Sequence, residues 1–178
     1  LSNNDSGDNN TILGYGAGAS VSSGVDNSVF IGHQAADAMD GTEQSNVAIG
    51  FASMGAVDEG GSGEANSNIA IGANTLTGGA LSSTEAVAYN VAIGDNALNS
   101  TGTSAQSGTI AIGADAGTAI NHTDASGSVL IGHQAGAAIT SGSANVAVGY
   151  QAGYSIVGYS NNTCVGHQAG YFIKEHNN

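Results

Sequence analysis

The stretch NVAIG at residues 46–50 decides the fold, because closely related five-residue phrases return along almost the whole chain. Each phrase has a small polar or hydroxyl residue, a β-branched residue, an apolar residue, an aliphatic residue and a glycine, and such periodicity is the signature of a repeat protein. The glycines are 17 to 22 residues apart, so a fixed unit carries a loop of variable length. The nine copies are NTILG (10–14), SVFIG (28–32), NVAIG (46–50), NIAIG (68–72), NVAIG (90–94), TIAIG (109–113), SVLIG (128–132), NVAVG (145–149) and NTCVG (162–166).

Each unit continues past the glycine in a related way, for example as HQAG at residues 133–136 and 167–170. No period of 3.6 residues emerges, and each interior Gly costs a helix about 1 kcal/mol relative to Ala. We therefore predict a strand, a glycine corner, a shorter strand and an exposed loop in every unit. The second strand would end near the apolar residues Val21, Met39, Val57, Ile120, Ile139, Ile156 and Ile173.

One unit per coil gives an all-β, parallel β-solenoid. We predict about nine coils of 17 to 22 residues over residues 10–173, with a lead-in at residues 1–9 and a tail at residues 174–178. Alternate side chains of a strand point to opposite faces, so positions two and four of each phrase share one side. That side is aliphatic, and we predict that it lines the inside of the coil. The predicted core ladder is Val29, Ile31, Val47, Ile49, Ile69, Ile71, Val91, Ile93, Ile110, Ile112, Val129, Ile131, Val146, Val148 and Val165.

Position three lies on the opposite face and is apolar in all nine phrases. A strand that is apolar on both faces is normally covered on both, so we predict that this face meets another chain. A two-sided core within one chain stays open as the alternative. The predicted subunit interface is Ile12, Phe30, Ala48, Ala70, Ala92, Ala111, Leu130, Ala147 and Cys164.

The charge balance excludes several partners. Fourteen acidic residues and a single base, Lys174, give a net charge of −13. Nucleic acids and anionic membranes attract clusters of Lys and Arg, so we expect neither partner, and no apolar run reaches the ~20 residues of a membrane span. The single cysteine, Cys164, cannot form an intrachain disulfide. Because residue 1 is Leu, we expect a processed or excised piece of a longer protein.

The phrases over residues 10–173 resemble the head repeats of trimeric autotransporter adhesins, the YadA-like head, whose coils carry a phrase similar to NVAIG followed by a Gly- and Ala-rich stretch. The resemblance implies a left-handed β-roll in which three chains associate around a three-fold axis with small residues facing it. The coils here are longer than a typical head repeat. GYQAGYS (149–155) and GHQAGY (166–171) also look like repeats of bacteriophage tail-fibre proteins.

The sequence shows no obvious group of catalytic residues. The acidic side chains are scattered mostly singly, so we predict no enzyme and no catalytic site. The position after the phrase glycine is His33, His133 or His167 in three coils, and three chains would bring three such imidazoles together as a candidate metal site. Tyr and Phe fill the same position in other coils, which favours packing of flat rings, and we predict no metal or other cofactor. Calcium binding in an acidic loop stays an alternative.

We therefore expect a structural or adhesive segment of a homotrimeric fibre, on a bacterial surface or a virion. Recognition of a host-surface glycan or protein would fall to the long loops near residues 57–66 and 78–89 and to the aromatic C-terminal end. The predicted ligand-contacting residues are Tyr154, Tyr159 and Tyr171, although capping of the last coil is a simpler role for them. The alternatives are a bacteriophage tail-fibre segment for host recognition and a polysaccharide-cleaving tail spike.

Overall fold

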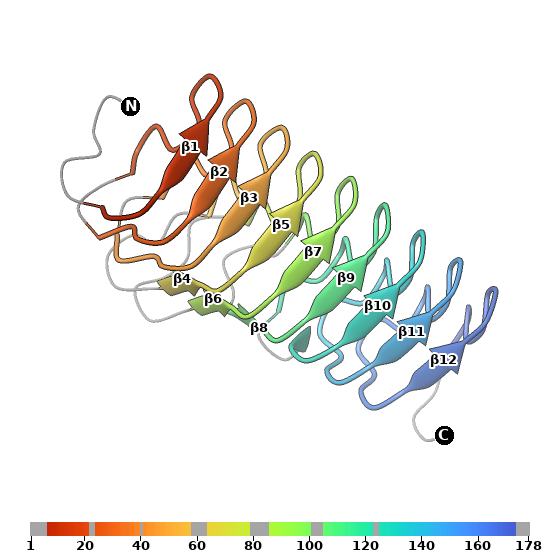
Figure 1. Ribbon diagram of the computed structural model, residues 1–178. Helices are drawn as coiled ribbons and strands as arrows, with labels where there is room; N and C mark the ends of the chain where they lie inside the picture. Colours follow the sequence, from red (N-terminus) through yellow and green to blue (C-terminus); the bar gives the residue numbers. More distant parts are fainter. Residues whose placement is uncertain are drawn as a thin grey trace.

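The computed structural model describes residues 7–21, 24–39, 41–57, 64–78, 86–100, 105–122 and 125–173. The chain is an all-β parallel β-solenoid. Its coils step along an elongated stack, with the first and last described coils at opposite ends (Figure 1). The predicted tail at residues 174–178 lies outside the described residues.

One parallel sheet runs the full length of the stack, and every strand in it lies inside a repeat phrase. Equivalent phrase positions pair from coil to coil, as Phe30 does with Ala48 and Ala48 with Ala70. The prediction of one repeat unit per coil is confirmed. The nine strands are β1 (Thr11–Leu13), β2 (Val29–Ile31), β3 (Val47–Ile49), β5 (Ile69–Ile71), β7 (Val91–Ile93), β9 (Ile110–Ile112), β10 (Val129–Ile131), β11 (Val146–Val148) and β12 (Thr163–Val165).

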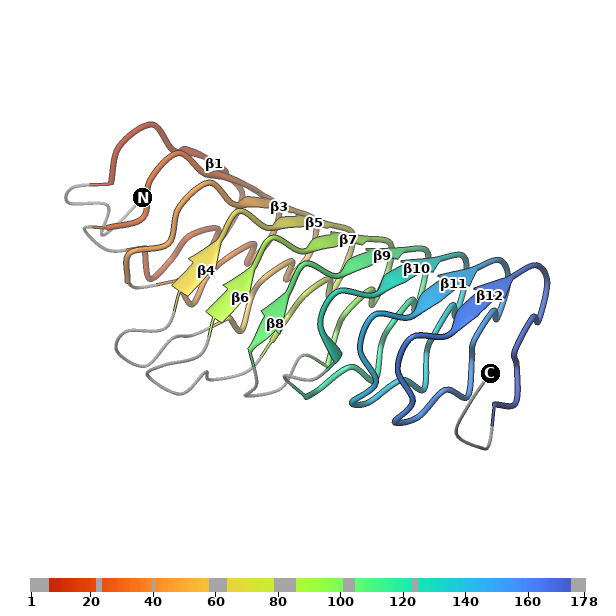
Figure 2. The ribbon, with the colours of Figure 1, turned by 90° about the horizontal axis from the view of Figure 1, so that it is seen from below.

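A second, shorter parallel sheet flanks the first and joins the strands β4 (Glu64–Asn66), β6 (Ala86–Ala88) and β8 (Gln106–Ser107) (Figure 2). These strands precede the phrase, so the prediction of a shorter strand after the glycine is wrong. The chain turns there instead, because the second and fourth residues past the glycine adopt positive φ. Gln151 and Gly153, for example, have φ of 52° and 59°, and left-handed backbone interrupts an extended strand.

The phrase glycine is required by the close approach of neighbouring coils. Gly32 has a φ of 140°, and a Cβ built on it would overlap the carbonyl oxygen of Gly50 in the next coil. An L side chain at this corner would therefore push two coils apart.

The prediction of which strand face is buried is wrong. Position three points into the coil, where Phe30, Ala48 and Leu130 are completely buried within one chain. The interior is narrow because the chain returns close behind the sheet, so the face that carries Ala in five of nine phrases fits inside. The predicted subunit interface is thus interior to one coil: Phe30, Ala48, Ala70, Ala92, Ala111, Leu130, Ala147 and Cys164 are buried, and Ile12 packs against them.

Positions two and four form the outer face of the long sheet. The predicted core ladder is therefore not in the core. Its side chains are half-buried in most coils and exposed at Ile69, Ile131 and Val165, and none of them belongs to the buried cluster: Val29, Ile31, Val47, Ile49, Ile69, Ile71, Val91, Ile93, Ile110, Ile112, Val129, Ile131, Val146, Val148 and Val165.

Side-chain volume in the core is shared between phrase position three and the fourth residue past the glycine. Leu130 is matched by Gly136, where a Cβ would lie 2.7 Å from a Leu130 methyl group. In another coil Ala92 is matched by the buried Leu98. The remaining coils pair Ile12 with Gly18, Phe30 with Ala36, Ala48 with Met54, Ala70 with Leu76, Ala111 with Gly117, Ala147 with Gly153, and Cys164 with Gly170. No coil has a large residue at both positions, and the coils that pair Ala111 with Gly117 and Ala147 with Gly153 have one at neither.

A ladder of buried polar side chains at phrase position one ties the coils together. The Asn68 carboxamide oxygen accepts the backbone N–H of Asn90 at 3.1 Å, and its Nδ2 donates to the carbonyl of Val87 at 2.6 Å. Asn46 accepts the N–H of Asn68 in the same way, at 3.0 Å. Each amide thereby connects the long sheet of one coil to the next coil and to the second sheet, which fixes the register.

Candidate functional site

The outer face of the long sheet is apolar along most of its length. Two aliphatic side chains per coil, from phrase positions two and four, stand side by side in most strands, and Ile69 and Ile131 are 38% and 36% exposed. Nine strands about 4.8 Å apart, each three residues wide, make a strip of roughly 43 by 10 Å. Such a strip is as large as the biggest apolar patches on monomeric proteins, which are often interaction sites.

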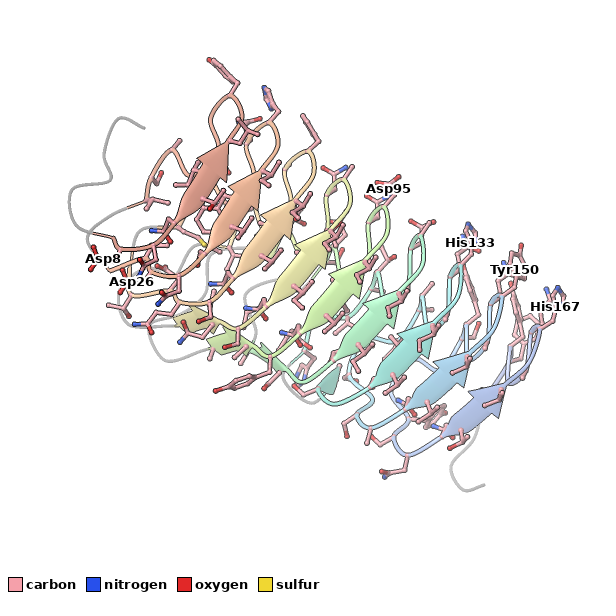
Figure 3. All side chains as sticks on the ribbon, viewed as in Figure 1. Asp8, Asp26, Asp95, His133, Tyr150 and His167 are labelled. Carbon is pink, nitrogen blue, oxygen red and sulfur yellow. The ribbon has the colours of Figure 1, made fainter. Side chains whose placement is uncertain are left out.

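The corner after the glycine carries two stacks of flat rings, which confirms the packing interpretation of this position. His33 lies between Tyr15 and Phe51, with ring centroids 5.3 and 5.4 Å apart. The second stack, which we call the ring row, contains His133, Tyr150 and His167, with centroids 5.5 and 5.2 Å apart. Its three side chains project from successive loops along one edge of the stack (Figure 3).

Two further ladders accompany the ring row in the last coils. In the amide row, Gln151 Nε2 donates to Gln134 Oε1 at 2.8 Å, and Gln168 Nε2 donates to Gln151 Oε1 at 2.9 Å. In the tyrosine row, the rings of Tyr154 and Tyr171 stack with centroids 5.0 Å apart and planes 5° from parallel. Sequence reasoning missed the amide row, although the recurring QAG in these coils is its signal.

The three predicted ligand-contacting tyrosines do not form one group. Tyr154 and Tyr171 lie together, and Tyr171 also meets Phe172 edge to face. Tyr159 instead packs against the buried core, and its carbonyl accepts a hydrogen bond from the Asn145 amide at 2.8 Å. The long loops predicted to share in recognition lie largely outside the described residues.

The acidic side chains of the described residues are mostly solitary. Partial burial raises the pKa of Asp37, an effect that its own backbone, the Gln34 side chain and His33 oppose. Asp8 and Asp26 lie on adjacent coils, where the Asp8 backbone N–H donates to an Asp26 carboxylate oxygen at 2.7 Å. Within the described ranges, no three His, Cys, Asp or Glu side chains gather as metal ligands would.

Asp95 and Cys164 lie outside these rows. Asp95 takes the ring position of its coil and projects from the same edge as the rings (Figure 3). Cys164 is buried in the last coil, and burial raises the pKa of its thiol. The thiol is therefore held in its protonated, less reactive form.

Comparison with known proteins finds no matching family, no matching curated protein and no matching solved structure. No helix in the described part of the chain is long and apolar enough to cross a bilayer.

Proposed function

We propose that this chain is a structural and adhesive segment of an extracellular or virion-borne homotrimeric fibre, and that it is not an enzyme. The observation that carries the proposal is the outer face of the long sheet, which has Val or Ile at both outward positions in seven of its nine strands. A face that is repeated from coil to coil suits a second copy of the same chain, because each coil then meets an equivalent coil of the partner.

The three-fold arrangement and the left hand of the solenoid come from the resemblance to adhesin heads. The corrected geometry changes which residues would meet at the axis. Val and Ile from positions two and four now form the contact, while the small residues of position three fill each chain's own core. A bacteriophage tail fibre is the second candidate, because the GYQAGYS and GHQAGY coils, which look like its repeats, carry the whole tyrosine row and most of the ring and amide rows.

The proposal is tested by a charge placed on the outer face. Ile93→Asp would bring three carboxylates into an apolar contact, at a cost of several kcal/mol for each unpaired buried charge. In one chain Ile93 is only half-buried, so its coil should remain folded. Ser107→Asp is the matched control, because Ser107 is an exposed strand residue of the second sheet.

Light scattering after gel filtration measures the assembly, and circular dichroism checks the fold. We expect Ile93→Asp to be folded and monomeric and Ser107→Asp to be folded and trimeric. Trimers of normal stability for Ile93→Asp would refute an axis built on this face.

A further inference from the structure

We propose that the corner surface of the last three coils binds a neutral, extended glycan along the fibre, with one sugar unit per coil. The surface consists of the ring, amide and tyrosine rows. The inference rests on the proposed adhesive function, whose ligand class it names.

The three rows share one surface. The second and fifth residues past the glycine contact each other in earlier coils, where Asn99 Nδ2 donates to Asn96 Oδ1 at 3.0 Å. The Gln34 side chain likewise bonds to Asp37. In the last two coils these two positions hold the Gln of the amide row and the Tyr of the tyrosine row, whereas the coil before them has Gln134 and Ala137. The ring row immediately precedes the amide row in sequence, so along the corner of the last two coils the amides come between the rings and the tyrosines.

The rows present groups that suit sugar hydroxyls. Each ladder bond uses one N–H of a Gln amide and one lone pair of the next, so a second N–H and a second lone pair remain for a ligand. The ring faces are stacked on one another, so the ring rims meet the solvent, and Tyr150 is 45% exposed. Aromatic rims flanking amides offer apolar contact and hydrogen bonds together, as a pyranose ring requires.

The spacing of the rows matches an extended polysaccharide. Ring centroids in the ring row and the tyrosine row repeat every 5.0 to 5.5 Å. This is close to the length of one hexose unit in an extended β-1,4-linked chain. A linear ligand therefore meets a ring and an amide at each of the three coils and a tyrosine at the last two, and its contacts add along the stack.

The charge of this region selects a neutral ligand. Between residues 125 and 173 the sequence has no Asp, Glu, Lys or Arg, although the whole chain carries a net charge of −13. Neither a cationic nor an anionic partner finds a fixed countercharge here, and the negative remainder of the chain repels an anionic polymer.

The experiment is titration calorimetry of the intact protein with cellohexaose and chitohexaose, with cellobiose and a hexameric oligogalacturonate as comparators. We expect saturable binding of at least one neutral hexamer, weaker binding of the dimer and none of the anionic hexamer. If neither neutral hexamer binds, or if the oligogalacturonate binds as tightly, the inference is overturned.

Variants locate the site. Tyr150→Ala removes the central ring, and we expect at least about fivefold weaker binding, as for the loss of one aromatic contact. Gln151→Glu keeps the side-chain shape but adds a charge to the amide row, and it should also weaken binding. Phe51→Ala is the matched control, because Phe51 has the same ring position and a stacked His33, but Ala52 and Gly55 stand where the amide and tyrosine rows would be.

Circular dichroism establishes whether each variant is folded. If Tyr150→Ala does not fold, the binding measured for Gln151→Glu decides the test. Equal binding by Gln151→Glu and the parent chain, or an equal loss in Phe51→Ala, would place the ligand elsewhere and overturn the inference. The mass of the same samples separates this inference from the proposed function. A trimer that binds no neutral hexamer overturns the glycan site alone, and a monomer that binds one overturns the fibre alone.

Discussion

The sharing of core volume between Leu130 and Gly136 predicts that two damaging substitutions compensate each other. Leu130→Ala removes a completely buried side chain, which costs about 3 kcal/mol when the cavity does not collapse. Gly136→Leu overpacks the same space, because even a Cβ at Gly136 lies 2.7 Å from Leu130 and 2.8 Å from Ile139. Overpacking and a Leu at positive φ together cost about 3 kcal/mol.

The double variant moves the large side chain to the other side of the coil, the arrangement that the Ala92 and Leu98 pair already has. Leu98 itself has a φ of 49°, so a leucine is tolerated at this backbone position. We expect the double variant to lose about 2 kcal/mol rather than the sum of about 6, because neighbouring residues that share one cavity are strongly coupled. Equilibrium urea unfolding, followed by circular dichroism at one protein concentration, measures all four proteins. Additive losses would refute the shared-volume account of the core.

Three further predictions concern the ladder, the rise and the pH response. Asn68→Ala leaves the N–H of Asn90 and the carbonyl of Val87 without their partner, so urea unfolding should show a loss of about 3 kcal/mol; Asn68→Ser should lose less, because Ser28 Oγ already accepts the equivalent N–H of Asn46 at 3.1 Å. Deletion of residues 109–127 joins Gly108 to Ser128 in phase and should shorten the rod by one strand spacing, about 4.8 Å, in small-angle scattering; any other change would reject one unit per coil. Because the pKa of Asp37 is raised in the folded state, its ionisation lowers stability as the pH rises above the ordinary value of 3.8. Asp37→Asn should therefore raise the melting temperature at neutral pH and give no gain well below pH 3.8, and a gain of the same size at both pH values would contradict this assignment.

The repeat could be predicted from sequence because it is a one-dimensional pattern. Every phrase from residues 10–14 to 162–166 became a strand of one sheet, paired with the equivalent phrase of the next coil. The glycine corner could also be predicted, since only glycine fits where Gly32 approaches the backbone of Gly50.

The inside and outside of the coil could not be assigned in the same way. The alternation of side chains along a strand predicts that Val91 and Ile93 share one face and that Ala92 lies on the other. Both faces are apolar, so the pattern does not indicate which of them is inside. The deciding quantity is the width of the coil interior, which depends on how closely the rest of each coil passes behind the long sheet. A signal was nevertheless present in the sequence, because a large residue at Leu98 accompanies a small one at Ala92, whereas Leu130 accompanies Gly136.

The candidate site could be predicted only in part. The shared position of His133, Tyr150 and His167 predicts a stack of rings, which the structure confirms. The three tyrosines near the C-terminal end do not reveal from sequence alone that Tyr154 and Tyr171 pair while Tyr159 packs against the core. Their grouping depends on which positions of the corner face outward, and this is set by the two left-handed residues in each turn.

The mass of the unmodified chain in solution tests the central claim most directly. Sedimentation equilibrium at micromolar concentration should give three times the chain mass of 17.2 kDa, about 52 kDa, if the outer face of the long sheet associates around a three-fold axis. A mass of 17.2 kDa across the concentration range, from folded protein, would contradict it.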